Sequence, residues 1–92
     1  MTEKQIYVQA LKTWGPSAQT NMVFEEMAEL QKELCKNGRG KDNRDHIAEE
    51  IADVLIMLEQ MMILHDCRKL VTVYKTEKLQ RLEERIKEAA YD

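Results

Sequence analysis

The chain has 92 residues, a net charge of −3 and a pI near 5.4. This length suits a single domain, residues 1–92, whose modest core is only marginally stable alone. The acidic balance argues against binding a nucleic-acid backbone, which requires a basic face. The N-terminus lacks the apolar stretch of a signal peptide, and the most apolar run, 54–64, is shorter than the ~20 residues of a membrane span. We therefore expect a cytoplasmic protein that does not enter a membrane.

The first predicted helix covers about residues 3–13, where apolar side chains recur on one side. Gly15 and Pro16 then break the pattern, because glycine and proline are the strongest interruptions of local structure. Trp14 lies at this break and has two interpretations. It packs at the junction after the helix, which is the commoner use of an aromatic side chain, or it stacks on a nucleotide base.

The second predicted helix covers about residues 17–36, with apolar side chains at helical spacing at Met22, Val23, Met27, Leu30 and Leu34. Gly38 is the predicted left-handed residue that ends it, since glycine adopts that conformation without steric cost. The polar stretch 37–44 is the predicted long loop and carries three basic residues. It is a solvated connector or, alternatively, a lid over a phosphate group.

The third predicted helix begins at about residue 42 or 43 and ends at about 64, and the fourth covers about 68–90. The β-branched stretch 71–73 is locally poor in helix formers, but the surrounding helical periodicity favours a continuous helix. Short connections between long helices predict antiparallel neighbours and an all-α four-helix bundle. Because apolar residues lie on several helix faces of a small chain, we also expect a homo-oligomer.

Two acidic motifs repeat one pattern, EEMAE at residues 25–29 and EEIAD at residues 49–53. At ~100° per residue, Glu26 and Glu50 lie within the apolar arcs of their helices. The third acid of each motif lies at the edge of its arc, and the first acid turns towards solvent. The inward-facing acids are therefore Glu26, Glu29, Glu50 and Asp53.

Several carboxylates on two facing apolar arcs need positively charged partners, because burying an isolated carboxylate costs several kcal/mol. Lys or Arg side chains would supply this charge, or shared divalent cations such as Mg²⁺ or Mn²⁺, which prefer oxygen ligands. The alternative is that these are ordinary acids on a solvated helix face, which is what a single ExxE pattern usually means. Periodicity alone leaves the metal site and the solvated face about equally supported.

The pattern Glu26-x-x-Glu29 followed by Glu50-x-x-Asp53 resembles the ExxE…ExxD motif of the MazG-like nucleotide pyrophosphohydrolases, of the all-α NTP pyrophosphatase superfamily. The flanking segments FEEMAELQKEL and IAEEIADVLIMLEQ are similar too. The basic segment KLQR, residues 78–81, resembles a KFxR-type element that follows the acidic motifs in that family. The resemblance covers nearly the whole chain, and the paired motif is far more specific than either half.

The resemblance implies a Mg²⁺-dependent enzyme, with Mn²⁺ as an alternative metal, that hydrolyses an NTP or dNTP to the monophosphate and pyrophosphate. The four motif acids would bind the metal, which would lower the pKa of a bound water. Lys78 and Arg81 would offset charge on the phosphates, and Glu25 or Glu49 would orient or deprotonate the water. The assembly would be a homodimer or homotetramer. The competing hypothesis is a non-catalytic helical module for oligomerisation or nucleotide binding.

Overall fold

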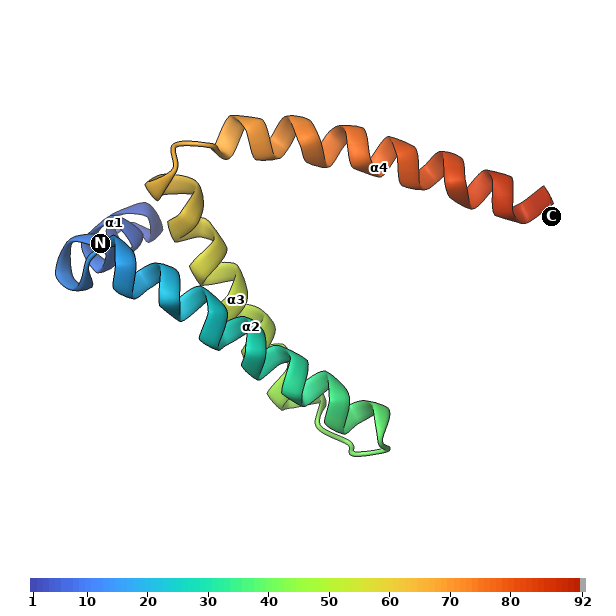
Figure 1. Cartoon of the computed structure of the whole chain (residues 1–92), viewed down its shortest axis with the longest axis horizontal. Coiled ribbons are helices and arrows are strands. Elements are labelled where there is room, and N and C mark those ends of the chain that lie inside the picture. Colours follow the sequence, from blue (N-terminus) through green and yellow to red (C-terminus); the bar gives the residue numbers. More distant parts are fainter. Residues whose placement is uncertain (92) are drawn as a thin grey trace.

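The computed structural model describes residues 1–91, which form four α-helices and, within that range, no strand (Figure 1). The helices are α1 (Glu3–Trp14), α2 (Pro16–Gly38), α3 (Arg44–Leu64) and α4 (Arg68–Tyr91). The all-α prediction is confirmed, and the predicted helix ends agree to within about two residues. No helix among these residues is long and apolar enough to cross a membrane.

Local chemistry explains where the first two helices begin and why they are separate. Thr2 caps α1, since its hydroxyl accepts a hydrogen bond from the Gln5 backbone N–H while the Gln5 side chain accepts one from the Thr2 N–H. Gly15 follows α1 with φ of 90°, a conformation that favours glycine. Pro16 begins α2, where its fixed φ suits a helix start and its missing N–H costs nothing.

The end of α2 differs from the prediction in one respect. Gly38 is the last helical residue, and the glycine with positive φ is Gly40, at 96°. The helix continues because Arg39 N–H donates to the carbonyls of Cys35 and Lys36, and Gly40 N–H donates to that of Asn37. The loop before α3 is therefore shorter than the predicted stretch 37–44.

The packed body of the protein consists of α1, α2 and α3. The antiparallel helices α2 and α3 lie side by side along much of their length, and α1 packs against both near one end (Figure 1). The core is small, because the buried apolar residues are Tyr7, Val23 and Met57. Trp14 is 65% exposed, so the packing interpretation of this residue is wrong within one chain.

Helix α4 projects away from this body (Figure 1). Every residue of α4 is exposed, and of the other helices it contacts only α3. The prediction of antiparallel neighbours thus holds for α2 and α3 but not for α3 and α4. Because of this projection, the radius of gyration is 16.8 Å, whereas a globular domain of this length has one of about 12 Å.

Asn43 ties the loop before α3 to α2. It is 3% exposed, and its amide nitrogen donates to the Glu33 backbone carbonyl at 2.9 Å and to the Glu33 carboxylate at 2.6 Å. Its amide oxygen accepts a hydrogen bond from Asn37. These bonds fix where α3 starts relative to α2, and therefore how the acids of the two helices face each other.

Replacing Asn43 with alanine is expected to destabilise the fold by about 2 kcal/mol, because it leaves buried polar groups without partners. For a domain of this size, that corresponds to a fall of about 10 °C in Tm. Thermal unfolding followed by circular dichroism measures the change. Asn21→Ala, at an exposed position of α2, is the control. Equal Tm values for the two variants would contradict the stabilising role of the Asn43 hydrogen bonds.

Candidate metal centre

Three carboxylates from the two motifs converge between α2 and α3. One oxygen each of Glu26, Glu50 and Asp53 lies within 4.8 Å of the others. All three side chains are half-buried. The predicted inward phase of Glu26 and Glu50 agrees with this placement, since their helical neighbours Val23 and Met57 are buried.

The other motif acids lie outside this three-residue group. Glu29 is exposed, although its charge raises the pKa of both Glu26 and Glu50. Glu25 and Glu49 are exposed, as their phase predicted. The structure therefore brings together three of the four predicted metal ligands and leaves the fourth at the rim.

Two carboxyl groups of the centre, those of Glu26 and Glu50, have a raised pKa. Burial raises the pKa of Glu26 above its ordinary value of 4.5, and the charges of Asp53 and Glu50 raise it further. Burial and the charge of Asp53 likewise raise the pKa of Glu50. The strongest charges acting on both groups come from other acids, which is the electrostatic state that a bound cation would relieve.

Glu50 carries an unusual buried oxygen. Its Oε2 atom is shielded from solvent, and no donor among residues 1–91 forms a hydrogen bond to it. Buried carboxylate oxygens normally have a partner, because losing hydration without one is costly. A divalent cation would supply such a partner, so the donor set fits Mg²⁺ or Mn²⁺ chemically.

The spacing of the oxygens is compatible with a shared ion. Because one oxygen of each carboxylate lies within 4.8 Å of the other two, a single divalent cation between α2 and α3 would be held by all three residues.

Glu33 is a participant that the sequence analysis missed. It lies one turn beyond Glu29 on α2, and its charge also raises the pKa of Glu50. The hydrogen bond from Asn43, helped by Lys36 at 3.4 Å, lowers the pKa of Glu33 and keeps it ionised. The i, i+3, i+7 spacing from Glu26 is the sequence signal that would have found it.

The predicted basic residues do not join the acids within one chain. Lys78 and Arg81 are exposed on the projecting helix α4, which contacts neither α1 nor α2. Among residues 1–91, no cationic side chain forms an ion pair with any of the four motif acids. One chain therefore provides the acidic half of the expected site without the basic half.

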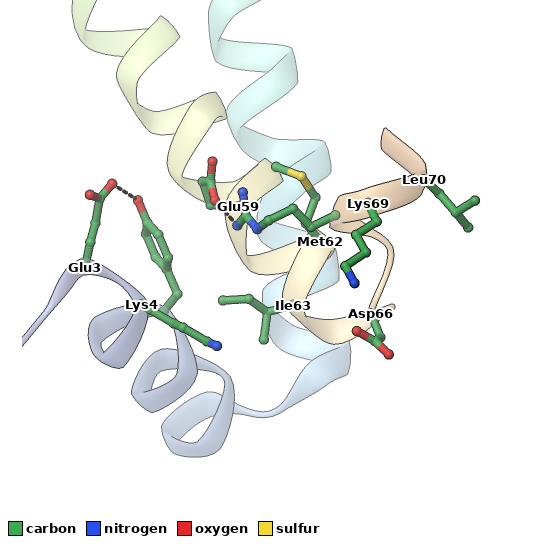
Figure 2. Close-up of a pocket in the computed structure, with 10 residues that line it drawn as sticks. Glu3, Lys4, Glu59, Met62, Ile63, Asp66, Lys69 and Leu70 are labelled. Atoms are coloured by element: carbon green, nitrogen blue, oxygen red, sulfur yellow. Dashed lines mark hydrogen bonds and ion pairs between the residues drawn. The ribbon is translucent and has the colours of Figure 1, made fainter. Parts of the chain in front are cut away.

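A separate groove lies between α1, α3 and the start of α4. It occupies about 790 Å³, with Glu3 and Lys4 of α1 on one wall and Glu59 and Ile63 of α3 on the other (Figure 2). The Tyr7 hydroxyl donates to Glu3 at 2.7 Å, and Glu59 pairs with Arg68 at the start of α4. The groove is lined by both acidic and basic side chains, so it offers neither the all-acidic donor set of a metal site nor the all-basic lining of a phosphate site.

Comparison with known proteins adds no relative, because the chain matches no protein family, no curated protein and no solved structure.

Proposed function

We propose that this protein is a Mg²⁺-dependent nucleoside triphosphate pyrophosphohydrolase. The observation that carries the proposal is the convergence of Glu26, Glu50 and Asp53, with Glu50 Oε2 buried and unpaired among residues 1–91. The resemblance of the paired motif to the MazG-like enzymes supplies the reaction class. Acids of this kind, without a cationic partner, suit a divalent metal better than they suit a folded core.

The chemistry assigns a role to each group. Bound Mg²⁺ would neutralise the carboxylates and attract the triphosphate, whose negative charge the acidic centre repels on its own. Water would cleave the bond between the α- and β-phosphates, giving a nucleoside monophosphate and pyrophosphate. Glu29 is the fourth proposed ligand, at the rim, and Glu25 or Glu49 the proposed group that orients the water. The enzyme is proposed to act in the cytoplasm as a homo-oligomer.

Incubation with a panel of NTPs and dNTPs and with Mg²⁺ or Mn²⁺ tests the reaction, with products separated by anion-exchange chromatography. We expect a monophosphate and pyrophosphate in equal amounts. Release of a diphosphate and inorganic phosphate would mean a different cleavage, and no turnover at micromolar enzyme with either metal would contradict the catalytic proposal.

The same protein preparations also distinguish the enzyme from the alternative, a non-catalytic nucleotide-binding module. A thermal shift with Mg²⁺ and nucleotide, without any product, would identify the module, because a ligand that binds only the native state raises its apparent stability. Asp53→Asn is the control in both measurements, since it removes one of the three converging carboxylates while keeping its shape.

A further inference from the structure

Helix α4 has a net positive charge, whereas residues 1–67 have a net negative charge. It carries seven basic and four acidic side chains, a net charge of +3, whereas residues 1–67 carry seven basic and twelve acidic ones, a net charge of −5. Two parts of one chain thus bear opposite charge, yet among residues 1–91 the ion pair between α4 and the body is the one from Arg68, at the first residue of the helix.

The charges of α4 are arranged around an apolar stripe. At ~100° per residue, Val71, Leu82 and Ile86 fall on one side of the helix. Lys75 lies within this stripe and Lys78 and Arg81 flank it on one edge, while Glu77, Glu83 and Glu84 lie further round. The stripe has no cover, since Leu82 is 49% exposed and Ile86 is 61% exposed. An exposed amphipathic helix face is one that packs against another apolar surface, and the basic residues beside it favour a surface that is also acidic.

The exposed area indicates what covers the stripe. The chain exposes 7551 Å², whereas a folded monomer of 10.8 kDa exposes about 5500 Å². The excess of about 2000 Å² is what one subunit buries in a large homodimer interface. Apolar side chains on the body are exposed as well, among them Phe24 on α2 and Leu55 on α3.

We infer that α4 of each chain packs on the α2–α3 body of a second copy, where Lys78 and Arg81 complete the acidic centre of that copy. The inference rests on the proposed function for the role of the two basic residues, but not for the interface itself. The complementary charges and the exposed stripe select a second copy as the occupant. A reciprocal exchange of this kind closes as a two-fold dimer.

The interface is tested first by mass. Light scattering of the full chain should give twice the 10.8 kDa chain mass. Leu82→Glu, within the stripe, should give a monomer, while Gln80→Glu, on the opposite side of α4, should leave the dimer intact. A monomeric wild-type protein at micromolar concentration, or equal behaviour of the two variants, would overturn the inference.

The position of Lys78 is tested without any activity. A carbodiimide joins a lysine amine to a carboxylate only when the two are in contact. In a mixture of ¹⁴N- and ¹⁵N-labelled chains, mass spectrometry should find Lys78 linked to a motif acid in peptides of mixed label. Links confined to one label, or no link from Lys78 to these acids, would overturn the shared site.

The catalytic contribution is tested by mixing two inactive variants, Glu26→Gln and the double variant Lys78→Ala/Arg81→Ala. After exchange of subunits, half of the dimers are mixed, and one of their two sites is complete, so about a quarter of wild-type activity should return. A mixture as inactive as its components would overturn the shared site. An inactive wild-type protein that is dimeric and forms the Lys78 link would instead refute only the proposed reaction.

Discussion

Glu50→Gln is expected to lower the rate of nucleotide hydrolysis by at least about 100-fold. Losses of this size are typical when an enzyme loses one group that stabilises charge in the transition state. The same substitution should raise the Tm of the metal-free protein. The reason is that Glu50 is half-buried among acids, with one oxygen lacking a hydrogen bond among residues 1–91. Glutamine keeps the size of the side chain and removes the charge that burial disfavours.

Tm in EDTA and turnover in Mg²⁺ measure the two effects on the same preparations. The matched control for stability is Glu25→Gln, which removes the same charge from an exposed position of α2. Its metal-free Tm should stay close to that of the wild type, because surface substitutions rarely change stability by more than about 0.5 kcal/mol. A lower metal-free Tm for Glu50→Gln would show that the charge stabilises the fold and would count against the metal centre.

The stability of the metal-free protein is expected to fall as the pH rises from about 4.5 towards neutrality. The pKa values of Glu26 and Glu50 are raised above their ordinary 4.5. Within the window from 4.5 up to those raised values, the folded protein therefore binds more protons than the unfolded chain, and deprotonation costs it stability. Glu33 acts in the opposite sense but below pH 4.5, because its pKa is lowered. Stability should thus be greatest near pH 4.5.

Mg²⁺ should cancel this loss. The ion binds the deprotonated carboxylates, so the rise in Tm that it causes should be large at about pH 7.5 and vanish towards pH 4.5, where protons compete for the same oxygens. Thermal unfolding across this range, with Mg²⁺ and with a monovalent salt of equal ionic strength, measures the effect. Equal Tm values in the two salts at every pH would refute a specific metal centre.

The sequence by itself determined the helices and the phase of the acids. Capping by Thr2 and Gln5, the break at Gly15 and Pro16, and apolar residues at helical spacing are local features, so α1 to α4 follow from short-range chemistry. The same periodicity placed Glu26 and Glu50 within the apolar arcs, and the structure finds both half-buried.

Only the tertiary structure decided which acids meet and where α4 lies. The register of α2 against α3, fixed in part by the bonds from Asn43 to Glu33, brings Asp53 to the centre and leaves Glu29 at the rim. No local pattern encodes such a register, because it depends on contacts between residues distant in the chain. The direction of α4 depends likewise on the connection after α3, where Asp66 adopts a φ of 48°. This direction separates the predicted basic residues Lys78 and Arg81 from the acids of the same chain, and no local pattern in the sequence encodes it.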